Sequence, residues 1–133
     1  MTKYTDIGVE IHGHVGLIEI RRPPLNFFDI SLINQIADAL EGFDRDIEIR
    51  ASVLAAQGKA FCAGGNVKGM GANRDPKKLE MSYEDKVADL QERQRLLTGA
   101  LASVRKPTIA ALPGPAVGAG LAIAMACDIR IAA

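Results

Sequence analysis

The sequence contains no tryptophan, only two cysteines and no run of basic residues. Two cysteines, Cys62 and Cys127, are too few for the disulfide framework of a small secreted domain, so we expect free thiols in a reducing compartment. The 16 basic residues are matched by 16 acidic ones, which argues against nucleic acid or an anionic membrane as the main partner. The first residues contain no apolar segment typical of a secretory signal. We therefore expect a cytoplasmic protein.

One stretch, residues 107–127, lacks charged residues and approaches the length of a bilayer span. Three prolines and three glycines interrupt it, and alanine is far more frequent in it than leucine. Proline and glycine break a continuous helix, so the stretch predicts a short strand, a turn and a helix inside a protein core. No membrane partner is expected.

The length of 133 residues and an apolar content of 48% suffice for one domain with a hydrophobic core. Apolar residues recur with strand-like and helical periodicities along the chain. These periodicities predict, in order, a hairpin over 7–11 and 15–20, a helix over 31–43, a buried strand over 51–55, a helix over 87–104, a strand over 108–112, a helix over 117–126 and a strand over 128–132. Asp29 or Ser31 is expected to cap the first helix.

Strands that alternate with helices indicate crossover connections and a largely parallel, buried sheet. Residues 70–85 are polar and rich in turn-forming residues, which predicts a mobile surface segment. The final predicted strand is apolar and has no helix after it, so its edge would be unprotected. This suggests either further sequence or a partner chain.

Two glycine-rich segments, 62–66 and 114–120, each follow a predicted strand. Small residues at such places let a ligand approach the backbone closely, and a helix N-terminus offers unpaired N–H donors. Two donors that converge on one carbonyl oxygen would form an oxyanion hole. From spacing alone, the favoured interpretation is that these glycines only permit tight turns and close helix–sheet packing.

Nucleotide-binding motifs fit these segments poorly. The dinucleotide fingerprint requires a third small residue where Ile123 stands, and an acidic residue about twenty positions further on is missing from the chain. A phosphate-binding loop would need a Gly-Lys-Ser/Thr sequence, which the chain lacks. Both nucleotide interpretations are therefore excluded.

Residues 106–128, KPTIAALPGPAVGAGLAIAMACD, resemble the signature stretch of the crotonase (enoyl-CoA hydratase/isomerase) superfamily. Residues 59–70, KAFCAGGNVKGM, resemble the loop after a buried strand in the same family, and Pro24-Leu25-Asn26 is similar to a third, weaker element. The resemblance covers essentially the whole chain but only the first half of the family's usual length. It implies an α/β fold, a crotonase-like spiral of repeated ββα units that is incomplete at the C-terminus. Residues 1–133 would then be the N-terminal part of a single domain.

The resemblance also implies a function. The family binds a coenzyme A thioester as substrate, without a permanently bound cofactor or metal, and stabilises the enolate that forms at its carbonyl. By position, the two backbone N–H donors of the oxyanion hole fall on Gly65 and Ala119. The residues implied to bind the coenzyme are Ala60, Phe61, Ala63, Asn66 and Lys68. Family members are usually homo-oligomers, trimers or hexamers.

Two positions depart from the family pattern. Asparagine stands at position 66, where aspartate is common, and Ala122 occupies the position of the first catalytic glutamate of hydratases. The second glutamate would lie beyond Ala133. We therefore expect an isomerase-type, single-base proton transfer rather than a two-glutamate addition of water. The alternative is a catalytically inactive, truncated crotonase module that binds coenzyme A or a partner chain.

Other chemically versatile residues carry less weight. His12 and His14 flank a glycine turn and have no cluster of carboxylates or cysteines nearby, which argues against a metal site. Cys62 is expected to be a small packed thiol rather than a nucleophile. Asp128 is expected to be a buried structural carboxylate rather than a general base.

Overall fold

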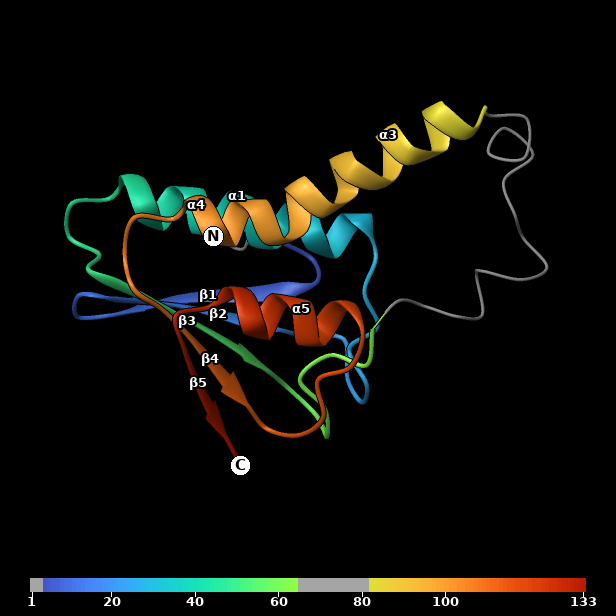
Figure 1. Cartoon of the computed structure of the whole chain (residues 1–133). Helices are drawn as coiled ribbons and strands as arrows, with labels where there is room; N and C mark the ends of the chain where they lie inside the picture. The colour runs from blue at the N-terminus through green and yellow to red at the C-terminus, as the bar shows by residue number, and fades with distance from the viewer. Residues whose placement is uncertain (1–3, 65–81) are drawn as a thin grey trace.

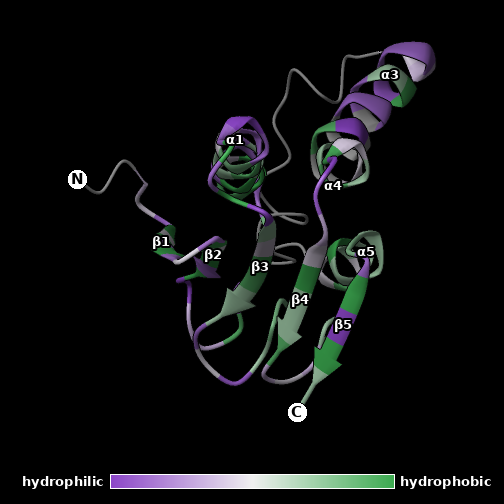
Figure 2. Ribbon diagram, turned by 90° about the vertical axis from the view of Figure 1, so that its left-hand side faces the viewer, coloured by the Kyte–Doolittle hydropathy of each residue, from purple (hydrophilic) through white to green (hydrophobic). Residues whose placement is uncertain are grey.

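A computed structural model describes residues 4–64 and 82–133, and in this part of the chain five strands form one sheet (Figure 1). The strands are β1 (Ile7–His12), β2 (Val15–Ile20), β3 (Ala51–Ala56), β4 (Thr108–Leu112) and β5 (Ile129–Ala132). The helical segments are α1 (Ile30–Arg45), α3 (Tyr83–Gln94), the π-helical turn η2 (Arg95–Gly99), α4 (Ala100–Ser103) and α5 (Ala119–Ala126). The helices lie on one side of the sheet (Figure 2).

The sheet follows chain order, β1-β2-β3-β4-β5. β1 and β2 form the predicted antiparallel hairpin, and the later neighbours are all parallel. The expectation of a largely parallel sheet is thus confirmed. The register places Ile18, Leu54 and Ala110 side by side across the three central strands. All three are buried beneath the helices, because alternate strand residues point to the same face.

Helix α1 begins as the sequence predicts. Asp29 is its N-cap and its side chain accepts a hydrogen bond from the Leu32 amide at 3.0 Å, which satisfies one of the amides that a helix start leaves unpaired. The Ser31 hydroxyl instead donates to Asp6. Apolar residues at helical spacing form the buried side of α1: Leu32, Ile33, Ile36, Ala39, Leu40 and Phe43.

The predicted helix over 87–104 differs from the structure in two respects. It begins earlier, at Tyr83, because the Ser82 hydroxyl accepts from the Asp85 amide and caps the helix start. The last residues of the segment predicted to be mobile, 70–85, are therefore helical, and residues 65–81 lie outside the described part. The helix is also divided by the η2 turn, beyond which Leu101 of α4 is buried in the core.

Strand β5 differs from the expected buried sheet because all four of its residues are exposed. Arg130 occupies the register position of the core row, opposite Ala110. Its guanidinium donates to the main-chain oxygens of Ala124, Met125 and Cys127 at the end of α5. A cation suits a helix C-terminus, where unpaired carbonyls carry partial negative charge. The side chain therefore ties β5 to α5 rather than filling the core.

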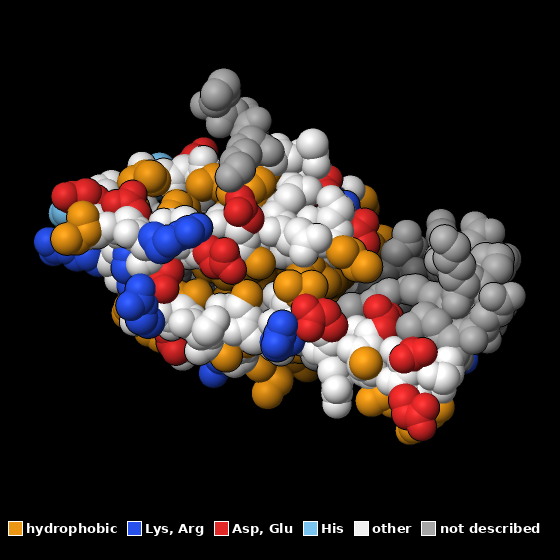
Figure 3. All heavy atoms as spheres, turned by 90° about the horizontal axis from the view of Figure 1, so that it is seen from above, with side chains coloured by type: hydrophobic (Ala, Val, Ile, Leu, Met, Phe, Trp, Pro, Cys, Tyr) orange, Lys and Arg blue, Asp and Glu red, His pale blue; other side chains and the backbone are white. Residues whose placement is uncertain are grey.

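The outer face of the helices carries both acidic and basic side chains (Figure 3), as expected from the balanced composition. Among the helices that the structure describes, none combines the length and the apolar character needed to cross a bilayer.

Candidate active site

The two glycine-rich segments meet at the carboxyl ends of β3 and β4. We call residues 57–64 the β3 exit loop and residues 113–118 the β4 exit turn. The Phe61 amide donates to the Pro115 oxygen and the Val117 amide donates to the Cys62 oxygen, both at 3.0 Å. These bonds form a short parallel bridge between Cys62 and Ala116. The main chains of the two segments are therefore held side by side, as neighbouring parallel strand ends require.

Glycine is needed for this close approach. A Cβ atom added to Gly120 would lie 2.2 Å from the Cys62 oxygen, and one added to Gly114 would lie 2.0 Å from the Lys59 oxygen. Both distances are far inside van der Waals contact, and the obstacles are main-chain atoms that cannot rotate away. The simple structural interpretation of these two glycines is thus correct for Gly114 and Gly120.

Two further glycines, Gly64 and Gly118, precede the two candidate donors in the sequence. Gly64 and Gly118 both have positive φ, 94° and 56°, a conformation that glycine adopts without steric cost. A Cβ atom added to Gly64 would lie 3.1 Å from the Val117 oxygen, and one added to Gly118 would lie 3.8 Å from the Gly64 Cα atom. The residue that precedes predicted donor Gly65 therefore lies beside the residue that precedes predicted donor Ala119.

Ala119 is the first residue of α5, where an amide has no partner within the helix. Nearby, the Gly120 amide donates to the Val117 oxygen and the Ala122 amide donates to the Gly118 oxygen. The Ala119 amide has no hydrogen-bond acceptor among the described residues. One predicted donor is thus available at a helix N-terminus. The second, Gly65, lies outside the described residues, as do the predicted coenzyme-binding residues Asn66 and Lys68.

The remaining predicted coenzyme-binding residues belong to the β3 exit loop. Phe61 is completely buried, Ala60 is buried and Ala63 is half-buried. The Phe61 ring is part of the hydrophobic core beneath the loop. Phe61 and Ala60 therefore expose almost no surface to a ligand in this structure, and their coenzyme-binding role stays a prediction.

Residues 57–64 and 113–120 contain no aspartate, glutamate or histidine. Cys62 is completely buried, and this burial raises the pKa of its thiol, so the thiolate nucleophile is disfavoured. Ala122 on α5 offers no titratable group. No cluster of three or more potential metal ligands occurs within the described part of the chain. Within the described residues, the two segments therefore provide a free main-chain donor, the Ala119 amide, and no acid or base of their own.

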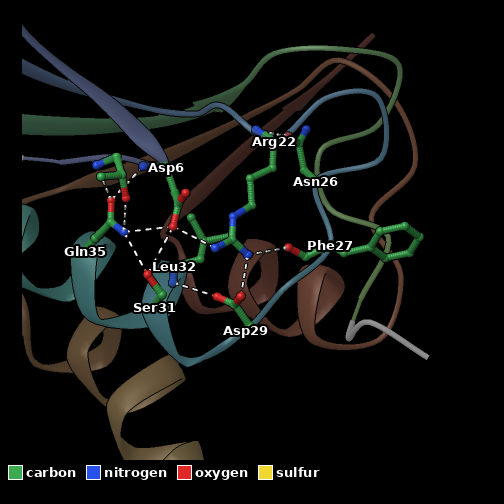
Figure 4. A network of polar contacts seen from close by, with 9 residues as sticks. Asp6, Arg22, Asn26, Phe27, Asp29, Ser31, Leu32 and Gln35 are labelled. Carbon is green, nitrogen blue, oxygen red and sulfur yellow. Dashed lines mark hydrogen bonds and ion pairs between the residues drawn. The ribbon is translucent and has the colours of Figure 1, made fainter. Parts of the chain in front are cut away.

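The sequence did not reveal a charged network where β2 ends (Figure 4). The Arg22 guanidinium pairs with Asp6 at 2.6 Å and with Asp29 at 2.8 Å. The hydrogen bond from Arg22 is the main reason why the pKa of Asp6 is lowered. Partial burial alone would raise the pKa of Asp29, but hydrogen bonds from Arg22 and from the Leu32 amide lower it overall. Arg22 thus joins Asp6, directly before β1, to Asp29, the N-cap of α1.

Asp128 has a structural role, but the prediction that it is buried was wrong. The residue is exposed, and its carboxylate accepts hydrogen bonds from the Thr108 amide at 2.9 Å and from the Thr108 hydroxyl at 3.2 Å. These bonds join the starts of β4 and β5, at the opposite end of the strands from the glycine segments. His12 and His14 are also exposed.

Comparison with known proteins supports the resemblance. The family model described as enoyl-CoA hydratase/isomerase matches residues 10–133. A probable enoyl-CoA hydratase of Mycobacterium bovis is 36% identical over 132 residues, which are 98% of this chain and 47% of that protein. A probable enoyl-CoA hydratase of Rhizobium meliloti is 38% identical over 133 residues, 97% of this chain and 46% of that protein.

Solved structures give the same result. An enoyl-CoA hydratase from Shewanella pealeana superposes with a TM-score of 0.82 at 30% identity, covering 98% of this chain and 47% of that one. The enoyl-CoA hydratase subunit I from Geobacillus kaustophilus has a TM-score of 0.79 at 34% identity, covering 99% and 48%. The expected crotonase-like α/β fold is confirmed, and the chain spans about half the length of these relatives. The chain belongs to the enoyl-CoA hydratase/isomerase family.

Proposed function

We propose that the protein binds an acyl-CoA thioester and stabilises the enolate of its carbonyl group between two backbone N–H donors, those of Gly65 and Ala119. Enoyl-CoA hydratase relatives of about twice the length support the substrate class. The observation that carries the proposal is the proximity of Gly64 to residues 117–118, which places the residues before both donors side by side.

The local environment suits a thioester oxygen. Ala119 begins an eight-residue helix, AGLAIAMA, that contains no charged residue. The helix dipole favours negative charge at this end. A donor that is fixed before the reaction and shielded from water stabilises a developing oxyanion by about 3–4 kcal/mol. Because the donor is an amide, alanine in place of glycine at position 119 does not remove it.

We propose isomerase-type rather than two-glutamate hydratase chemistry for the whole protein. Ala122 cannot act as an acid or base, and its amide is already bonded to the Gly118 oxygen. A single base elsewhere would remove an α-proton, leave the electron pair on the enolate oxygen and return a proton further along the acyl chain. The same absence of a carboxylate on the two segments favours the second candidate, a module that binds the thioester without turnover.

The other features are proposed on the family resemblance. Ala60, Phe61 and Ala63, together with Asn66 and Lys68, would line the coenzyme site, with no resident cofactor. A homo-oligomer, trimer or hexamer, is proposed on the same basis. The two cysteines are buried and unpaired, which fits a reducing compartment such as the cytoplasm.

The test uses butyryl-CoA and its thioether S-butyl-CoA, which differ only in the carbonyl oxygen. We expect the protein to bind butyryl-CoA more tightly, as measured by calorimetry, because only this ligand engages the two N–H donors. Equal affinity for the two ligands, or no binding of either, would contradict the oxyanion hole.

Ala119→Pro gives a specific variant. Proline is well tolerated as the first residue of a helix and removes only its N–H. We expect this substitution to abolish the preference for the thioester, whereas Ala119→Ser, which keeps the amide, should retain it. Incubation with an enoyl-CoA then separates the two candidates: movement of the double bond supports the isomerase, and tight binding without conversion supports the inactive module.

A further inference from the structure

Asn26 is a buried polar residue with an unusual backbone conformation. Its side chain and main chain are completely inaccessible to solvent, and its φ of 52° lies in the left-handed region. Asparagine is among the few non-glycine residues that adopt this conformation readily. A buried amide is stable only if its donors and acceptor are paired, so the partners of Asn26 indicate its role.

The Asn26 side chain makes three hydrogen bonds. Its amide nitrogen donates to the Gln57 oxygen at 2.6 Å and to the Ala60 oxygen at 2.9 Å. Its amide oxygen accepts from the Arg22 main-chain N–H at 2.8 Å. The first two partners belong to the β3 exit loop, thirty or more positions away in the sequence. One side chain therefore fixes two points of the loop that leads into the candidate oxyanion site.

Main-chain hydrogen bonds also join the residues around Asn26 to the β3 exit loop. The Lys59 amide donates to the Pro24 oxygen at 3.2 Å and the Ala63 amide donates to the Leu25 oxygen at 2.9 Å. The Phe28 amide donates to the Gly64 oxygen at 2.8 Å. Residues 22–28 thus follow the β3 exit loop over its length. The opposite side of this loop is the one bonded to the β4 exit turn.

The chemistry of the amide side chain is essential to this arrangement. Two main-chain oxygens need N–H donors and one main-chain N–H needs an acceptor, and asparagine supplies both kinds of group in one short side chain. Aspartate would place a carboxylate oxygen against two carbonyl oxygens. Glycine would retain the backbone conformation but leave all three main-chain groups without these partners.

We propose that Asn26 is a positioning residue of the oxyanion site: by holding the Gln57 and Ala60 oxygens it sets where the β3 exit loop lies relative to the Ala119 amide. This inference rests on the proposed function. Asn26 does not contact the ligand and acts through the loop. Because the strength of an oxyanion hole depends on the donor position, a displacement of the loop weakens the interaction with the thioester oxygen selectively.

The test measures the ratio of the dissociation constants for S-butyl-CoA and butyryl-CoA. We expect Asn26→Asp and Asn26→Gly to reduce this ratio about tenfold or more, with butyryl-CoA affinity falling and S-butyl-CoA affinity nearly constant. The matched control is Asn34→Ala, since Asn34 is exposed on α1 and should leave the ratio unchanged. A purely structural role would lower the unfolding midpoint without changing the ratio in the folded protein.

The possible outcomes distinguish a failure of the proposed oxyanion site from a failure of the proposed role of Asn26. A wild-type protein without thioester preference contradicts the proposed function itself. A wild-type preference that is retained in both folded Asn26 variants overturns the positioning role and leaves the oxyanion site intact. If the Asn26 variants do not fold, Gly58→Ala decides. Its added Cβ atom would lie 2.8 Å from the Pro24 oxygen and should displace the same loop, so an unchanged ratio in this variant overturns the inference.

Discussion

The two ends of strands β3 and β4 are built in different ways. At their carboxyl ends, the exit loop and exit turn are joined by main-chain hydrogen bonds and by glycines in close contact with neighbouring backbone. At their amino ends, the connections depend on long or charged side chains. Lys106 donates to the main-chain oxygens of Phe43 and Asp46, at 2.6 and 2.5 Å, and Asp128 accepts from Thr108.

The difference separates two requirements. A site that binds a ligand through its own amides requires a small, fixed backbone and few competing charges, which the carboxyl ends provide. The amino ends only have to connect β4 to β5 and to the end of α1. Hydrogen bonds from surface side chains suffice for these connections. We therefore expect the carboxyl ends to be sensitive to added volume and the amino ends to be sensitive to lost charge.

The largest effect is expected for Gly120→Ala at the carboxyl ends. The new Cβ atom would lie 2.2 Å from the Cys62 oxygen, and overpacking of this kind destabilises by about 3 kcal/mol. Gly42→Ala is the matched control because a Cβ atom there meets nothing within 4 Å on helix α1. This control should stabilise by about 0.5–1 kcal/mol. Urea unfolding of both variants measures the difference, and similar stabilities would break the comparison.

A smaller effect is expected for Lys106→Met at the amino ends. The substitution keeps much of the side-chain volume but removes the cation bonded to two oxygens near the end of α1. Hydrogen bonds of this charged type contribute about 1–2 kcal/mol when partly exposed. Lys86→Met on the exposed side of α3 should change the free energy of unfolding little. Equal losses in both variants would show that the amino ends do not depend on this charge.

The pH dependence of stability tests the charged network at the end of β2. Arg22 lowers the pKa of Asp6 and helps to lower that of Asp29, below their ordinary value of 3.8. Both carboxylates therefore stabilise the fold above the unfolded-state pKa, and this contribution is lost as the pH falls through the lower, folded-state pKa values. We expect Arg22→Met to be less stable than the wild type near pH 7, with the difference shrinking below about pH 4. Urea unfolding midpoints of both proteins across this pH range measure the stability difference. A difference that stays constant with pH would contradict a contribution from the titration of Asp6 and Asp29.

The smallest expected effect is on the reactivity of the two thiols. Cys62 lies at the carboxyl ends of β3 and β4, and Cys127 lies at their amino ends. Cys62 and Cys127 are both buried, and burial raises the pKa of each thiol, so both should react slowly with a thiol reagent. Asp128→Ala removes the two hydrogen bonds that Thr108 donates to the carboxylate of Asp128, the residue next to Cys127. We expect a few-fold faster labelling of Cys127 and no change at Cys62, as followed by mass spectrometry. Equal acceleration at both sites would indicate global loosening instead.

Much of the fold could be predicted because local signals agreed with the tertiary structure. The Asp29 cap, the hairpin and the parallel strands each follow from nearby residues and their periodicity. The sequence also indicated that the glycine segments 62–66 and 114–120 lie close together, because each follows a predicted strand of a parallel sheet. The resemblance supplied the specific donors, and of these Ala119 is seen at a helix N-terminus.

Other features depend on distant contacts and had no local signal. The π-helical turn at Arg95–Gly99 divides a helix whose apolar spacing appeared continuous over multiples of three and four residues. The exposure of Asp128 depends on how β5 lies at the sheet edge. The Asn26 side chain donates a hydrogen bond to the Ala60 oxygen, 34 positions away in the sequence. The spacing of apolar residues does not predict a side-chain hydrogen bond over such a distance.

Arg130 has a consequence for the outer edge of the sheet. Charged side chains commonly guard an edge strand against unwanted pairing, but the only charge of β5 is turned back toward the end of α5. The remaining residues of the strand are Ile129, Ile131 and Ala132, all accessible. Among the residues that the structure describes, the outer edge of this strand therefore carries no outward-facing charge of its own, so another strand could pair with it without first displacing a charge.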